Sequence, residues 1–361
     1  MSLSKEEQFW HAAGAGDLDI VKKLSSDPTL DVNWIGLERG DIPLHRACRF
    51  GHLLVVEFLL KLENIDVNDE NERGASPFYL ACQEGHTEVV SLLLADARID
   101  IHHPNSNGAT PFFMACQQCH ANVVSLLLAD ERIDVNRPRN DGGTPFNFSC
   151  GNGYKEVVSL LLADERIDVK KPNNNMSSPI WFASQNGHIS LVQLMLASGR
   201  EIDTKTKSIG GTAPWSNKSA AEVARHQAAR ARTIWETEVE YLTCKQNGPL
   251  IADLLDSYAI DPVTTRQQLR ELPELRNTFT SDLFALIVFF CDGLLRVNAA
   301  SSDIFSTSTK AARFIRVAQD LPIELQMVLC HRAFGSTRQN IPSADSEPAF
   351  KKLGRLLARE D

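Results

Sequence analysis

Apolar and polar positions recur with a fixed spacing along the chain up to about residue 245. The stretch Val-Val-Ser-Leu-Leu-Leu-Ala-Asp stands unchanged at 89–96, 123–130 and 157–164, so that its copies lie 34 residues apart. Within each copy, Val and Leu recur at i, i+3 and i+4, which is the spacing of the buried face of an amphipathic helix. A period of this length predicts a stack of similar units, each of which contacts only its neighbours.

A shorter helix is predicted ahead of each of these apolar helices. Proline recurs at the same period, and its missing N–H is tolerated in the first turn of a helix. Ser or Thr precedes it in most units, as a natural N-cap, and glycine follows it to end the helix. The prolines are Pro43, Pro77, Pro111, Pro145 and Pro179; the caps are Ser76, Thr110, Thr144 and Ser178; the glycines are Gly51, Gly85, Gly153 and Gly187.

This pattern resembles that of the ankyrin-repeat family. The resemblance covers about residues 5–245 and rests on Thr-Pro-Leu-His-like starts, Gly-His turns, Val-Val-x-Leu-Leu-Leu helices and Asp-Val-Asn loops. It implies an all-α fold, a solenoid of helix-turn-helix units joined by β-turn loops, in which the loop tips and first helices line one concave surface. The units are expected near 7–41, 42–75, 76–109, 110–143, 144–177 and 178–211, with a degenerate unit at 212–245.

The sequence departs from the family pattern at the starting tetrapeptide, whose histidine is present only as His45. The same slot holds Tyr79, Phe113, Asn147 and Trp181 in later units. We therefore expect aromatic packing to replace the local hydrogen bonds of this histidine. The asparagines of the Asp-Val-Asn loops, Asn33, Asn68 and Asn136, are predicted to stabilise turns.

From residue 246 the period is lost but the helical pattern continues. Helices are predicted over 249–258, 262–269, 281–297, 310–319, 322–334 and 347–359. We expect residues 1–245 to form the repeat domain and residues 246–361 a small helical bundle with its own core.

Composition and charge narrow the class of protein. The 361 residues carry a formal net charge of −9, which argues against a dedicated nucleic-acid binder. The longest apolar run, 283–290, is far shorter than the ~20 residues of a membrane span, and the first residues lack the apolar core of a secretory signal. Four of the eight cysteines follow the repeat period, as packing positions would. We expect a reduced, cytoplasmic protein, with the nucleus left open.

Candidate partner-binding residues lie first on the short helices, at positions that should face the concave surface. They are mostly uncharged and rich in amides, which suits adaptable hydrogen bonding to a protein. Arg49 and Phe50 are the expected anchor, because Arg and aromatic residues dominate binding hot spots. The set is Arg49, Phe50, Gln83, Glu84, Gln117, Gln118, Gly151, Asn152, Gln185 and Asn186.

A second candidate set lies at the loop tips, which become basic or histidine-bearing along the stack. Its members are His103, Arg137, Arg139, Lys170, Lys171, Lys205 and Lys207. A row of cations on an acidic body could steer and hold an acidic segment of a partner. The alternative is a solvated edge whose charges contribute little. Single-stranded RNA is a weaker alternative, because no stacking aromatics interleave the row.

No motif for catalysis or cofactor binding is found. Cys116-Gln-Gln-Cys119-His120 matches the spacing of haem attachment, but Cys116 and His120 fall in packing slots of the repeat. We therefore expect no cofactor, no metal and no enzyme activity. The prediction is a monomeric interaction module or scaffold that binds a protein partner and no membrane.

An alternative function is a ubiquitin-ligase adaptor, or an effector whose helical tail recruits a second protein. Leu329-Cys330-His331 with Phe334 faintly resembles the helix by which ankyrin–SOCS-box proteins recruit a ligase adaptor. The match is incomplete, because Gln326 stands where that motif has an aliphatic residue.

Overall fold

The computed structural model describes residues 3–36, 38–209, 215–233, 236–272 and 274–275. Every secondary-structure element in these segments is a helix. The chain divides into two compact units, one comprising Met1–Met195 and Arg200–Asp256, the other Leu196–Gly199 and Ser257–Asp361. The helices predicted over 281–297, 310–319, 322–334 and 347–359 lie outside the described residues.

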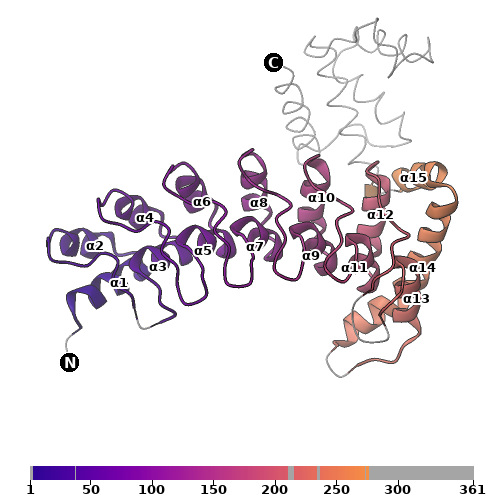
Figure 1. Ribbon diagram of the computed structural model, residues 1–361, viewed down its shortest axis with the longest axis horizontal. Helices are drawn as coiled ribbons and strands as arrows, with labels where there is room; N and C mark the ends of the chain where they lie inside the picture. The colour runs from indigo at the N-terminus through magenta and orange to yellow at the C-terminus, as the bar shows by residue number, and fades with distance from the viewer. Residues whose placement is uncertain (1–2, 37, 210–214, 234–235, 273, 276–361) are drawn as a thin grey trace, which may run out of the picture. The chain divides into compact units, whose positions relative to one another are not determined.

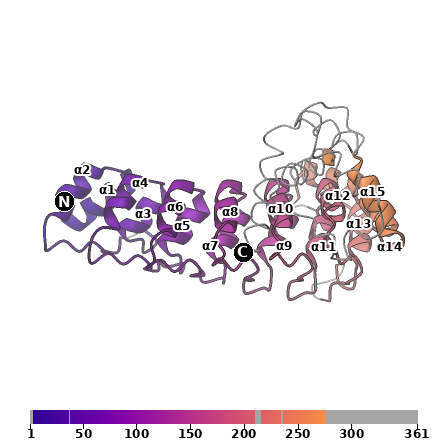
Figure 2. The same ribbon diagram turned by 90° about the horizontal axis from the view of Figure 1, so that it is seen from above.

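The first compact unit is a row of helix pairs, visible in two orthogonal views (Figures 1 and 2). The first helices of the pairs are α1 (Lys5–Ala15), α3 (Pro43–Arg49), α5 (Pro77–Glu84), α7 (Pro111–Gln117), α9 (Pro145–Asn152) and α11 (Pro179–Gln185). The second helices are α2 (Leu18–Ser25), α4 (Leu53–Leu59), α6 (Thr87–Leu94), α8 (Ala121–Leu128), α10 (Lys155–Ala163) and α12 (Ile189–Ala197). Each first helix packs on the first helix of the next pair, so the predicted stack is confirmed.

The predicted helix starts are also confirmed. Each first helix from α3 to α11 begins at the repeated proline. The hydroxyls of Ser76, Thr110 and Thr144 accept hydrogen bonds from the backbone N–H three residues on, at 3.1–3.2 Å. Ser178 occupies the same N-cap position without such a bond. These caps satisfy N–H groups that the first turn leaves without a helical partner.

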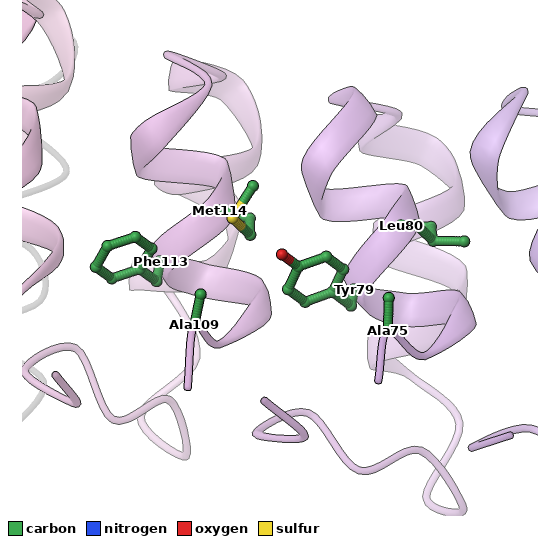
Figure 3. Packing of buried hydrophobic residues seen from close by; sticks show 6 residues of the cluster. All are labelled: Ala75, Tyr79, Leu80, Ala109, Phe113 and Met114. Carbon is green, nitrogen blue, oxygen red and sulfur yellow. The ribbon is translucent and has the colours of Figure 1, made fainter. Parts of the chain in front are cut away.

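Small and apolar residues fill the space between neighbouring pairs. Cys48, Cys82, Cys116 and Cys150 are each fully buried, which confirms the periodic cysteine as a packing residue, and burial raises the pKa of each thiol. Figure 3 shows the contact between the pairs that begin with α5 and α7, where the buried cluster comprises Ala75, Tyr79, Leu80, Ala109, Phe113 and Met114.

Side-chain hydrogen bonds tie each unit to its neighbour. The histidine of the Gly-His turn bonds to a carbonyl at the end of the preceding first helix, as His86 Nε2 does to Arg49 O at 2.9 Å. The loop asparagines act differently from the prediction. Asn68 donates to Arg98 O and accepts from Asp100 N, both at 2.8 Å, while Asp66 Oδ1 accepts from Asn68 N at 3.0 Å. The aspartate stabilises the turn, and the asparagine bridges two units.

An arginine ladder joins the second helices. In each copy of Arg-Ile-Asp, the arginine donates to a carbonyl at the C-terminal end of the preceding second helix. Arg98 bonds to Leu60 O, Arg132 to Leu94 O and Arg166 to Leu128 O, at 2.8–3.0 Å. Helix C-termini leave such carbonyls without an intrahelical partner, so each arginine caps its neighbour.

We expected aromatic packing to replace the hydrogen bonds of the starting-tetrapeptide histidine, and this is only partly right. His45 Nε2 bonds to Ala75 O at 2.9 Å, and Trp181 Nε1 donates to Lys218 O at 3.0 Å in the same manner. The Tyr79 hydroxyl accepts from Asn105 Nδ2 at 2.7 Å. Tyr79 and Trp181 thus keep a polar contact with the following unit, because each ring carries a polar atom at its far end. Phe113 has no such atom and contributes by packing.

The seventh pair differs from the prediction in its second helix. Its first helix, α13 (Ala220–Ala229), begins after the Ser219 cap as expected. Its partner α14 runs from Glu238 to Ile260, whereas the sequence predicted a helix only from Pro249. A Cβ on Gly248 would lie 2.5 Å from Ala224 O, so this glycine allows α13 and α14 to pack closely. The helix therefore continues through Pro249 despite the ~3 kcal/mol cost of a proline inside a helix.

The predicted division of the chain at residues 245 and 246 falls within α14. Residues 257–260 of this helix belong to the second compact unit. The following helix, α15 (Pro262–Arg270), begins at the predicted Asp261 cap, whose carboxylate accepts from Val263 N and Thr264 N at 3.1 Å.

Candidate partner-binding groove

A groove crosses the inner side of the first helices α3, α5 and α7 and encloses about 510 Å³. We call it the inner groove. Its walls are mainly hydrogen-bonding side chains, its floor is apolar, and its charged residues are three arginines and one glutamate. The walls include Asn71, Gln83, Asn105, Ser106, Asn107 and Gln117, the floor Tyr79, Leu80 and Met114, and the charged set Arg49, Glu72, Arg73 and Arg139.

The floor residues are almost fully buried. Leu80 and Met114 are only 2% and 7% exposed, and they pack with Tyr79 in the cluster of Figure 3. Burial raises the pKa of Tyr79 to about 12, so its phenol stays protonated at physiological pH. The floor therefore offers an apolar surface with one fixed hydroxyl.

Arg49 is anchored by a buried carboxylate. Its Nη2 lies 2.8 Å from Asp41 Oδ2, and Asn71 Nδ2 donates to the other carboxylate oxygen at 2.7 Å. The Asp41 side chain is 1% exposed and that of Arg49 is 11% exposed. Arg49 therefore shapes one end of the groove, and the structure gives it a stabilising role that the sequence did not suggest.

Arg139 closes the other end of the groove. It pairs with Asp141, and its guanidinium carbon lies 4.3 Å from the ring centroid of Phe148. In the units before it, this loop position is asparagine, and Asn105 Oδ1 accepts from Ala109 N at 3.0 Å. Asp141 takes over that turn-closing bond, to Gly143 N at 3.1 Å, which leaves the arginine to extend over the aromatic rings.

The inner groove brings together four of the predicted binding residues, Arg49, Gln83, Gln117 and Arg139. The other first-helix candidates lie outside it. Phe50 is 46% exposed and lies against Arg46, whose guanidinium carbon is 4.9 Å from its ring centroid. Glu84, Gln118, Asn152 and Asn186 are exposed, and Gln185 is half-buried.

The loop-tip candidates carry their own polar partners. His103 Nε2 lies 3.2 Å from Glu70, Lys170 Nζ 2.5 Å from Glu201, and Lys207 Nζ 2.9 Å from Glu222. Arg137 and Lys171 donate to carbonyls of the preceding tip, His102 O at 3.2 Å and Asn136 O at 3.4 Å. Lys205 is exposed. The tips therefore form a row of ion pairs and tip-to-tip hydrogen bonds, and part of their positive charge is neutralised locally.

The loop residues of the groove were not predicted from the sequence. Asn71 and Asn105 stand 34 residues apart and share the repeat position of Arg139, which was singled out for its charge. Arg73 and Asn107 likewise share one position. Aligning the loops by repeat position would have shown that these residues line the same face.

In the part of the chain that the structure describes, no three His, Cys, Asp or Glu side chains are grouped to hold a metal ion. Cys116 is fully buried while Cys119 is exposed, which agrees with the packing interpretation of the Cys-x-x-Cys-His segment. No helix in the described segments has the length and apolar character needed to cross a membrane.

Comparison with known families agrees with the helix-pair stack. A model of ankyrin repeats in three copies matches residues 9–103, 54–139, 97–172 and 131–208. The chain belongs to the ankyrin-repeat family. Ankyrin repeats generally mediate protein–protein interactions and are typically non-catalytic, and no catalytic family is identified. No curated protein matches the chain. The inner groove thus lies on the first helices and loops of an ankyrin stack.

Proposed function

We propose that the ankyrin stack is a non-enzymatic module that binds an extended segment of a protein partner in the inner groove. The observation that carries this is the composition of the groove, an apolar floor between walls of amide and hydroxyl side chains. An extended peptide needs this combination, because its backbone N–H and C=O groups require partners while alternate side chains seek apolar contacts.

The partner is proposed to carry acidic residues. Three arginines and a single glutamate line the groove. Arg49 and Arg139 have carboxylate partners of their own, whereas Arg73 makes no ion pair with the described residues. Arg73 is exposed and is therefore the arginine best placed to meet a carboxylate of the partner.

The test is peptide binding by the full chain. Random 12-residue peptides displayed on phage would be selected against the protein, and the enriched peptides would be synthesised for affinity measurement. The double variant Gln83→Ala/Gln117→Ala should weaken binding about tenfold or more, since each glutamine lines the groove. Ser91→Ala is the control, because Ser91 is exposed on α6 outside the groove. Equal binding by both variants would contradict the proposal.

The alternative of a ubiquitin-ligase adaptor or a recruiting effector remains a prediction. Cys330, His331 and Phe334 lie outside the described residues. Recovery of cullin-type proteins with the full chain, and their loss on Cys330→Asp, would favour it over a module that only binds its partner.

A further inference from the structure

Gly151 interrupts a row of long polar side chains. The residues at the same position of the other units are Arg49, Gln83, Gln117 and Gln185. The backbone does not require a glycine here, because Gly151 lies within α9 and is absent from the residues with positive φ. The absence of a side chain at Gly151 is therefore not needed by the backbone, and its effect is on the shape of the surface.

The space left by Gly151 borders the side chain of Phe182 in the next unit. Phe148 stands one turn earlier on α9, and a Cβ on Gly151 would lie 3.5 Å from Phe182 Cβ of the next unit, in ordinary contact. Both phenylalanines are half-buried, whereas Leu80 and Met114, at the same repeat position, are only 2% and 7% exposed. We call Phe148, Gly151 and Phe182 the aromatic notch.

The aromatic notch is continuous with the inner groove through one residue. Arg139 lines the groove, and its guanidinium carbon lies 4.3 Å from the ring centroid of Phe148. Phe148 also packs against the buried cluster that forms the groove floor, with its ring centroid 4.9 Å from that of Phe113. A chain that lies along the groove would therefore reach the notch.

We propose that the aromatic notch receives one large apolar side chain of the acidic, extended segment that binds in the inner groove. This inference rests on the proposed function and deepens it. A Phe, Tyr, Trp or Leu side chain would contact both rings and bury apolar area that is otherwise exposed. A carboxylate of the same segment meets Arg73, whose charge has no carboxylate partner among the described residues.

The two contacts fix a spacing in the partner. Arg73 precedes α5, and the notch lies between α9 and α11. Packed helices are ~10 Å apart, so these points are ~25 Å apart along the stack. An extended chain spans ~3.3 Å per residue. The acidic residue and the apolar anchor should therefore stand about six to eight residues apart.

The test uses the display-selected peptides and three variants of the full chain. Gly151→Gln places in the notch the side chain that other units carry and should weaken binding about tenfold. Gly151→Ala adds only the Cβ in ordinary contact with Phe182 and should cost less than about threefold. Ser91→Ala, the exposed control on α6, should leave binding unchanged. Thermal unfolding of Gly151→Gln should match or exceed that of the wild type, because glycine disfavours helix.

A second arm replaces the apolar anchor of the peptide with alanine. The wild type should lose about tenfold in affinity for this peptide, and Gly151→Gln should lose little further, because the anchor no longer has its pocket. The notch is refuted if Gly151→Gln binds within twofold of the wild type, or if enriched peptides lack an apolar residue at the stated spacing from an acidic one. If Gln83→Ala/Gln117→Ala still weakens binding in that case, only the notch fails. If that double variant binds normally too, or if no peptide is enriched, the proposed function fails with it.

Discussion

The buried pair of Asp41 and Arg49 can be tested with residues that the repeat itself supplies. The same two positions hold Ala75 with Gln83 in the next unit, and alanine with glutamine again in the unit after it. Asp41→Ala, Arg49→Gln and the double variant therefore form a thermodynamic cycle whose end point is a combination that the stack already tolerates.

The structure sets the expected magnitudes. Asp41 is 1% exposed, so Arg49→Gln leaves a buried carboxylate that keeps Asn71 as a side-chain donor. Removing one partner of such a pair costs about 3–5 kcal/mol. Asp41→Ala should cost less, about 1–2 kcal/mol, because Arg49 lies at the edge of the groove and can reach water, while Asn71 loses its acceptor. The double variant should recover about 2–3 kcal/mol relative to the sum.

The free energy of unfolding would be measured by urea denaturation, followed by far-ultraviolet circular dichroism. The m-values must agree among the four proteins, because a repeat stack can unfold in steps. The reasoning is refuted if Arg49→Gln unfolds within about 0.5 kcal/mol of the wild type, or if the two single changes add without coupling. Loss of binding by an Arg49 variant alone would not identify a contact with the partner, because the same change loosens α3.

Three further changes test other parts of the stack. Cys119 has φ 62° at the position held by Gly85 in the preceding unit, so Cys119→Gly should raise the unfolding free energy by about 1 kcal/mol, seen as a higher thermal midpoint. Arg166→Ala removes the 2.8 Å bond to Leu128 O and should lower the free energy of unfolding, measured in urea, by about 1–2 kcal/mol. The same change at Arg132 should cost less, because the Arg132 side chain is 56% exposed. Equal losses would count against the arginine ladder. Burial raises the pKa of Asp69 from 3.8 to about 6, so the folded state binds this proton more tightly than the unfolded state, and stability falls as pH rises through that range. Asp69→Asn should abolish this fall and stabilise the protein at neutral pH by about 1 kcal/mol; an unchanged pH profile would contradict the burial argument.

The sequence was sufficient for the repeated elements because their signals are local. Proline at the first turn, a hydroxyl before it and the apolar spacing of the second helix act within one unit, so Pro77 and Ser76 predict the start of α5 correctly. The helix that becomes α14 was misjudged because Pro249 is unfavourable locally, while the packing of Gly248 against Ala224 is not visible in the linear pattern.

The candidate site was predicted only in part. Gln83 and Gln117 follow from their helical positions and lie in the inner groove, but the loop asparagines that face them were not selected. The interpretation of Arg49 as a free anchor overlooked Asp41, which stands eight residues earlier and comes within 2.8 Å only when the loop folds back on α3.

The amino-acid sequence by itself determined the period, the helix pairs and their order, because propensity, capping and apolar spacing operate over a few residues. The tertiary structure alone decided which polar side chains form hydrogen bonds to neighbouring units and which remain available to a partner. His86, Asn68 and Arg98 look like surface residues in the sequence, yet each bonds to another unit. Arg73 and the gap at Gly151 become distinctive only when stacking brings residues about 34 positions apart onto one face.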